Sequence, residues 1–172
     1  MLTLSDSLYN IISTISSQAP ICLCIGSDRV TGDCFGPLVG EYLKNHHKIE
    51  AFVYGTLNLP VTALNLIETI SFIKKKHPFA CVLAIDSALG DSTEVGSLRI
   101  SNNGIFPGAA TGKHLPKVGD FSLTATVAPA GNSANLYGVQ LGLVNRLAIQ
   151  AANAIASCVS RLQTNLIRTV IV

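Results

Sequence analysis

Two aspartates follow apolar segments of the chain, at positions where an α/β sheet places its reactive groups. Asp33 lies in a glycine-rich turn after the apolar run "PICLCIG" (20–26), and Asp86 follows an apolar run that ends at Ile85. Ligands of open α/β sheets bind beyond the carboxyl ends of the strands, so adjacent strands would bring both carboxylates to one crevice. Two close carboxylates cannot both ionise without cost, so one pKa rises and the pair can share a proton. Such a pair could activate a water molecule, or it could bind a divalent cation.

The glycine-rich turn lacks the pattern of a phosphate-binding loop. Gly26 is followed by Gly32 and Asp33 with no lysine, so G-x-x-x-x-G-K-[ST] fails, as does the dinucleotide pattern G-x-G-x-x-G. The carboxylates would also repel a phosphate from the backbone amides of the turn. Gly32 and Gly36 are expected to let the turn approach other backbone closely. A structural role for Asp33 stays open, because it could cap the helix that begins near Gly36.

Other polar residues near the turn and in a later loop are candidate site residues. Asp28 is expected to pair with Arg29, which would keep it away from the catalytic pair, or to cap a turn. Lys113 and His114 lie in a polar loop rich in glycine and proline (101–120). Long loops without regular structure are usually functional or mobile, so this loop is expected to line the crevice. His114 could be a ligand or an ordinary surface histidine.

The five cysteines predict buried thiols, without a metal site or a disulfide. Cys22 and Cys24 have the wrong spacing for a zinc knuckle, and no partner pair follows them. An odd number of cysteines in apolar segments indicates free thiols in a reducing compartment. Cys34 is the candidate nucleophile, but no histidine lies near it in the sequence, which favours a packing role. No intrinsic metal and no other cofactor are expected.

The composition predicts a single α/β domain over residues 1–172. Apolar residues make up 48% of the 172 residues and charged residues 13%, which argues against disorder and leaves room for a homo-oligomer. The net charge is only +2, and the basic run Lys74–His77 is typical of a helix end, so no nucleic acid is expected as a partner. No signal peptide and no apolar run of membrane-spanning length are visible, so a cytoplasmic protein is expected.

Strand and helix patterns alternate along most of the chain. Strands are predicted at 20–26, 49–56, 78–90, 95–100 and 121–129, and helices at 1–19, from Pro37, at 59–76 and at 135–163, with a last strand or tail at 166–172. Within 78–90, the pattern predicts an apolar strand to Ile85, then Asp86 and a loop of small residues. Such alternation is typical of a mainly parallel sheet with helices on both faces. If the strands at 20–26 and 78–90 are neighbours, Asp33 and Asp86 face each other.

Three segments resemble the YyaC-type sporulation proteins of spore-forming bacteria: "IGSDRVTGDCFGPLVG" (25–40), "LAIDSALG" (83–90) and "LPKVGDFSLTATV" (115–127). These proteins are similar to the germination protease, which degrades small acid-soluble spore proteins. Both resemble the hydrogenase maturation endopeptidases in fold. The resemblance extends over most of the chain from about residue 20 to 160. It implies a three-layer αβα sandwich (phosphorylase/hydrolase-like).

The resemblance also implies roles for particular residues. A D-x-x-G-P turn and an I-D-A strand end carry the catalytic aspartates of the germination protease, and they match Asp33 and Asp86. This implies a metal-free endopeptidase-like hydrolase with a protein or peptide substrate, such as spore proteins, in the cytoplasm of the forespore or in the spore core. One alternative is a nickel-recognising maturation endopeptidase that uses Asp33, Asp86 and His114. Another is a non-catalytic sporulation factor that keeps the fold as a binding module.

Overall fold

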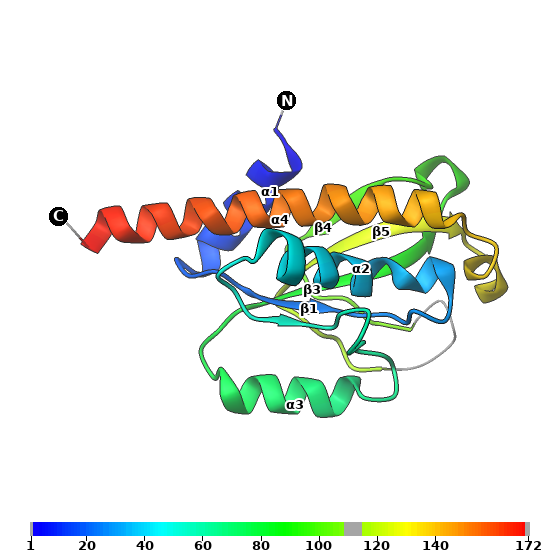
Figure 1. Ribbon diagram of the computed structural model, residues 1–172, viewed down its shortest axis with the longest axis horizontal. Coiled ribbons are helices and arrows are strands. Elements are labelled where there is room, and N and C mark those ends of the chain that lie inside the picture. Colours follow the sequence, from blue (N-terminus) through cyan, green and yellow to red (C-terminus); the bar gives the residue numbers. More distant parts are fainter. Residues whose placement is uncertain (1, 109–114, 171–172) are drawn as a thin grey trace.

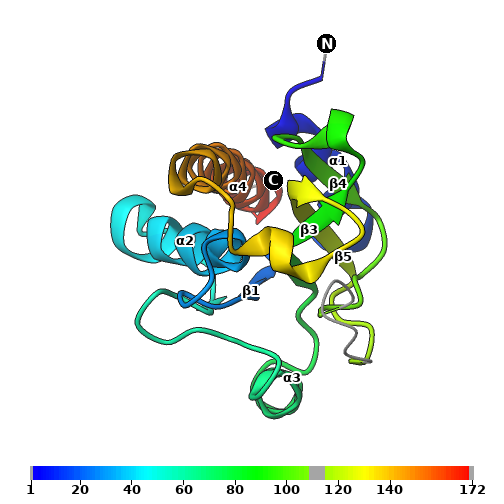
Figure 2. The ribbon, with the colours of Figure 1, turned by 90° about the vertical axis from the view of Figure 1, so that its right-hand side faces the viewer.

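The computed structural model describes residues 2–108 and 115–170 and has three layers (Figure 1). The middle layer is a sheet of β1 (Ile21–Cys24), β2 (Val53–Tyr54), β3 (Val82–Gly90), β4 (Leu98–Ser101) and β5 (Phe121–Pro129). One face is covered by α1 (Leu4–Ile15), α2 (Phe35–Glu41) and α4 (Leu141–Val170), and the other by α3 (Leu66–Lys76) (Figure 2). The α/β fold with flanking helices that the sequence predicts is confirmed.

The order of the strands decides where the site can lie. The sheet runs β2-β1-β3-β5-β4, and only β4 is antiparallel to its neighbour. The strands β1 and β3 are adjacent as predicted, with Cys24 opposite Ile85. However, β3 does not end at Ile85, because β5 continues to pair with it as far as Gly90. The predicted loop after Asp86 is therefore wrong, and Asp86 lies inside the strand at the level where β1 has ended.

Alternating side chains of the central strands fill two apolar cores. In β3, Leu83 and Ile85 pack with α1, α2 and α4, whereas Ala84 packs on the α3 side. These residues are buried because helices cover both faces of the sheet. This explains why the sequence of this part of the strand is a continuous apolar run. The side chain of Asp86 follows Ala84 on the α3 side of the sheet, since successive side chains alternate between the faces.

Two predicted elements differ from the structure. The helix predicted at 59–76 begins only at Leu66, because Val61 pairs with Ile25 at the end of the sheet and holds the preceding residues in a loop. The segment 166–172 was predicted as a strand or tail, but α4 continues to Val170, since neither glycine nor proline interrupts it after Gly142. None of the helices within residues 2–108 and 115–170 combines the length and the apolar character that crossing a membrane requires.

The start of α2 packs directly on the end of β1, and this contact gives the first prediction. A Cβ atom on Gly36 would lie 2.0 Å from the carbonyl oxygen of Ile25, which is backbone and cannot rotate away. We expect Gly36→Ala to lower the free energy of unfolding by about 1–3 kcal/mol, as overpacking of a core does. Urea denaturation measures this change. Gly142→Ala is the control, because its nearest atom is the end of the Arg146 side chain at 3.8 Å. Equal stabilities of the two variants would contradict the prediction.

Candidate functional site

The turn between β1 and α2 folds back on itself and fixes the position of Asp33. The backbone N–H of Ser27 donates to the carbonyl oxygen of Asp33 (3.0 Å), and the N–H of Asp33 donates to the carbonyl oxygen of Val30 (2.9 Å). Gly26 has a φ of 141°, and a Cβ there would lie 2.0 Å from the carbonyl oxygen of Asp33. Only glycine fits this close crossing of the chain. The glycine-rich turn thus holds the half-buried Asp33 beside the end of β1.

The structure tests the structural roles that were expected for the turn residues. The residue that caps α2 is Cys34, without a side-chain hydrogen bond, so the alternative that Asp33 caps this helix is wrong. A Cβ on Gly32 would lie 2.8 Å from the carbonyl oxygen of Leu136. The predicted close approaches at Gly32 and Gly36 are therefore confirmed.

Asp86 is a buried carboxyl group in the middle of the sheet. Asp86 is only 7% exposed, and its Oδ1 accepts a hydrogen bond from the N–H of Ser87 (2.8 Å). Burial raises the pKa of Asp86 well above its ordinary value, and the negative charge of Asp33 raises it further. The hydrogen bond from Ser87 acts in the opposite direction but is the weakest of the three effects. The environment of Asp86 therefore favours a protonated carboxyl group.

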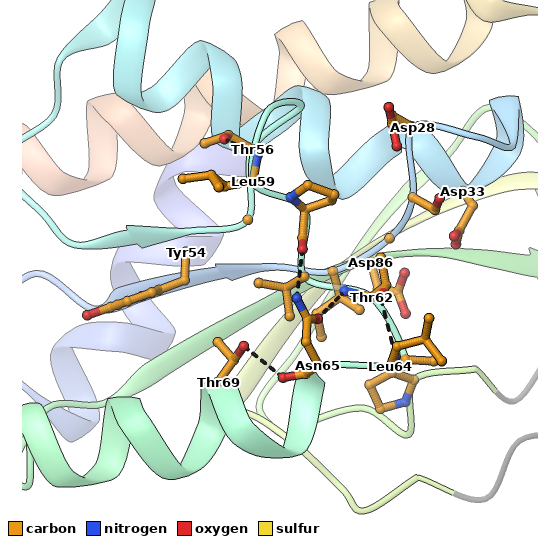
Figure 3. Close-up of a pocket in the computed structure, with 18 of the residues that line it drawn as sticks. Asp28, Asp33, Tyr54, Thr56, Leu59, Thr62, Leu64, Asn65, Thr69 and Asp86 are labelled. Carbon is orange, nitrogen blue, oxygen red and sulfur yellow. Dashed lines mark hydrogen bonds between the residues drawn. The ribbon is translucent and has the colours of Figure 1, made fainter.

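Asp33 and Asp86 line the same large pocket, as Figure 3 shows. The pocket has a volume of about 1020 Å³ and lies beyond the carboxyl ends of β1 and β2. We call it the first groove. Asp33 enters it from the turn after β1 and Asp86 enters it from β3, so the structure brings together the two residues that the sequence singled out.

A second pocket, of about 660 Å³, also has Asp33 and Asp86 in its wall. We call it the second groove. Its other walls are formed by β3 beyond Asp86, by Thr124 of β5, by the segment around Phe106 and by the residues between β5 and α4. The two aspartates therefore stand where the two grooves meet.

The sequence did not reveal that residues 56–65 form a wall of the first groove. Hydrogen bonds hold this loop: Asn65 accepts one from the N–H of Thr62 (2.8 Å) and donates one to the carbonyl oxygen of Pro60 (3.1 Å). Figure 3 shows Thr62, Leu64 and Asn65 of this loop in the same pocket as Asp33 and Asp86. Pro60 and Asn65 were the available signals, since proline and asparagine commonly mark loops before a helix.

The predictions for Arg29, Lys113 and His114 have different outcomes. Arg29 lines the first groove and is exposed, and its backbone N–H donates to Ser27 Oγ (3.2 Å). No ion pair joins Arg29 to Asp28 among the salt bridges of the described residues, so that predicted pair is wrong. Both side chains are exposed, where solvent leaves such a pair little net attraction. Lys113 and His114 lie outside the described residues, and their proposed roles stay predictions.

Cys34 lies beside the aspartates but lacks the character of a nucleophile. Burial raises the pKa of its thiol, and the negative charges of Asp28 and Asp33 raise it further. A thiol with a raised pKa stays protonated and unreactive near neutral pH. All five cysteines are buried and free. This environment supports the packing role expected for Cys34.

Binding of a metal ion requires several ligand side chains close together. Within residues 2–108 and 115–170, no three His, Cys, Asp or Glu side chains are arranged so that they could hold a metal. Structural zinc sites usually take four ligands, and catalytic zinc sites three protein ligands. His114, the third ligand in the nickel-recognising alternative, lies outside these residues, so that alternative stays a prediction.

Comparisons with known proteins give a family, a sequence relative and a solved structure of similar fold. The family described as "Protein of unknown function (DUF1256)" matches residues 1–160. The "Uncharacterized protein YyaC" of Bacillus subtilis (strain 168) is 43% identical over 111 residues, which are 64% of this chain and about half (54%) of that protein. A crystal structure of the [NiFe] hydrogenase maturation protease HycI from Thermococcus kodakarensis KOD1 has a TM-score of 0.59 and 22% identity, over 90% of this chain and 99% of that one. At this identity, the likeness to HycI shows the fold alone.

Proposed function

This chain belongs to the DUF1256 family, and we propose that it is an endopeptidase-like hydrolase in which Asp33 and Asp86 activate water. The resemblance to YyaC-type proteins is confirmed by the relative from Bacillus subtilis, and the fold is one that a hydrogenase maturation protease also has. The observation that carries the proposal is the position of Asp33 next to the buried Asp86, where two grooves meet. A carboxyl group with a raised pKa beside a more exposed carboxylate is the equipment of general acid/base catalysis.

The two aspartates take different roles in this proposal. Asp33, which is less buried, acts as the carboxylate that removes a proton from a water molecule. The oxygen of that water forms a bond with the carbonyl carbon of the peptide. Asp86 donates its proton to the amide nitrogen as the C–N bond breaks, which yields a carboxylic acid and an amine. Transfer of one proton from Asp33 to Asp86 then restores the starting state of the pair.

Small acid-soluble spore proteins are the first substrates to test, because the resemblance of the sequence to the germination protease implies them. The forespore is the corresponding location in this proposal. The experiment is to incubate the purified protein with these proteins and with a library of peptides, and to identify new termini by mass spectrometry. We expect cleavage at defined bonds. A folded protein that leaves every substrate intact would contradict the hydrolase and would support the binding module without catalysis.

The nickel-recognising alternative leads to a prediction about metal content. His114 is the only histidine after Asp86, and the described residues contain no suitable group of three donors. We therefore expect tag-free protein, purified without chelators, to contain no stoichiometric nickel or zinc by elemental analysis. A sample dialysed against a chelator serves as the control for background metal. One metal ion for each chain, lost from His114→Ala, would favour the nickel-recognising endopeptidase.

A further inference from the structure

One edge of β3 is open next to the paired aspartates. β1 accompanies β3 only to Ile85, where the N–H of Ile25 donates to the carbonyl oxygen of Ile85 (2.7 Å). On its other side, β3 stays paired with β5 as far as Gly90. Among the described residues, no strand therefore lies beside residues 87–89 on the side where β1 has ended.

The backbone groups of this edge point toward the side on which no described strand lies. In a strand, successive residues direct their N–H and C=O groups to opposite neighbours. Ile85 bonds toward β1, whereas the carbonyl oxygen of Gly90 accepts from Ala130 on the β5 side (2.8 Å). The pairing of β3 with β5 shifts register between Ala88 and Leu89, but the extra residue is Val127 of β5. Ser87 and Leu89 therefore still point the same way as Ile85, away from β5. The N–H of Ser87 is held by Asp86, which leaves the Ser87 carbonyl and both polar groups of Leu89 facing the open side.

The second groove follows this open edge. Ser87, Ala88 and Leu89 all line it, so the groove reaches this edge as well as the face of the sheet on which Thr124 of β5 lies beside Asp86. The groove reaches Asp33 and Asp86, and the first groove begins there on the other side. A chain laid in both grooves would therefore cross the two carboxyl groups.

We propose that the occupant of the two grooves is a peptide in extended conformation, which adds to β3 as a strand along residues 87–89. The peptide takes the place that β1 would occupy if it were longer, and its scissile bond lies at Asp33 and Asp86. The proposal rests on the proposed hydrolase in that this peptide is its substrate. An extended chain supplies backbone donors and acceptors that match a strand edge, while its alternate side chains enter pockets and provide specificity.

Each groove also has an exposed apolar side chain that can select a residue of the peptide. Leu64 is 90% exposed in the first groove, and Phe106 is 63% exposed in the second. Because the aspartates lie between the grooves, the two side chains contact the peptide on opposite sides of the scissile bond. The substrate class is therefore an unfolded segment with an apolar residue on each side of the cleaved bond.

The experiment measures binding separately from cleavage. Random 12-residue peptides are passed over immobilised Asp33→Asn protein, and the retained peptides are sequenced. The tightest peptide is then synthesised with a single N-methyl group at each backbone amide in turn. We expect N-methylation to weaken binding at least tenfold at alternate positions of the segment beside residues 87–89, because only every second amide faces the strand edge. The inference would be overturned if no peptide were retained, or if N-methylation weakened binding without this alternation.

Two variants then show which peptide position each groove contacts. We expect Leu64→Ala and Phe106→Ala to remove the apolar preference, each at a different peptide position on opposite sides of the scissile bond. Phe79→Ala is the matched control, because Phe79 is fully exposed (100%) and lines neither groove. The inference would be contradicted if both variants lost the apolar preference at the same peptide position, or if neither variant lost it at any position. Alternating binding without any cleavage by the unaltered protein would overturn the hydrolase alone, whereas cleavage without alternation would overturn the added strand alone.

Discussion

Asp33→Asn is expected to abolish peptide cleavage while the protein stays folded. Asparagine has nearly the shape of aspartate, but it cannot accept the proton of the attacking water. Loss of a general base typically lowers the rate by about 10²–10⁴-fold. The fold should survive because the turn is held by backbone hydrogen bonds of Ser27 and Asp33 that the substitution keeps. The measurement is kcat/KM on one cleaved peptide, with circular dichroism as the check of folding.

A matched control separates this effect from a general loss of negative charge. Asp91 is exposed, lines neither groove and makes no side-chain cap on the short helix that follows it. Asp91→Asn should therefore keep its activity within about twofold, since exposed charges of this kind contribute little. A fully active Asp33→Asn protein would show that Asp33 does not take the proton from water.

Asp86→Asn is expected to be inactive and yet more stable than the unaltered protein at neutral pH. The pKa of Asp86 is raised in the folded state, so the folded protein keeps a proton that the unfolded chain releases near the ordinary aspartate pKa of 3.8. Stability is therefore greatest below that pKa and falls as the pH rises through the raised value in the folded state. At pH values above the folded-state pKa, each unit by which the pKa of Asp86 differs between the folded and unfolded states lowers the free energy of unfolding by about 1.4 kcal/mol. Asparagine has no proton to lose, and its oxygen can still accept from Ser87.

Urea denaturation of both proteins between about pH 4 and pH 8 tests this expectation through the slope that linkage requires. The unaltered protein should lose stability as the pH rises, while Asp86→Asn should lose less of it, so that the difference grows with pH. Parallel curves would show that Asp86 is not a perturbed acid. Asp91→Asn is again the control, because it also removes one aspartate but leaves the buried one in place.

The local features of the site could be predicted from the sequence because they depend on neighbouring residues. The apolar run before Asp86 indicated a buried strand, and the glycines around Asp33 indicated a turn with close backbone contacts. Adjacent strands were a plausible hypothesis for a parallel sheet, and the structure confirms it for β1 and β3. The paired aspartates follow from these elements together.

The second groove could not be predicted, because it depends on where strands end relative to each other. The continuation of β3 past Asp86 is fixed by pairing with β5, a segment that begins more than thirty residues later in the chain. The loop at 56–65 was missed for a similar reason. Its residues have a helical pattern, but the contact of Val61 with Ile25 at the end of the sheet overrides it. Tertiary pairing of this kind leaves little trace in local periodicity.

The central claim is that Asp33 and Asp86 form one coupled acid/base pair, and its most direct test is the titration of their carboxyl groups. Carbon-13 NMR of aspartate-labelled protein, assigned with the two asparagine variants, follows each carboxyl group as the pH changes. We predict that Asp86 titrates above the ordinary aspartate range in the unaltered protein and at a lower pH in Asp33→Asn, because the neighbouring negative charge is gone. Its pKa should stay raised in that variant, since burial is the larger cause. Titration of Asp86 at the same pH in both proteins, or in the ordinary range, would contradict the claim.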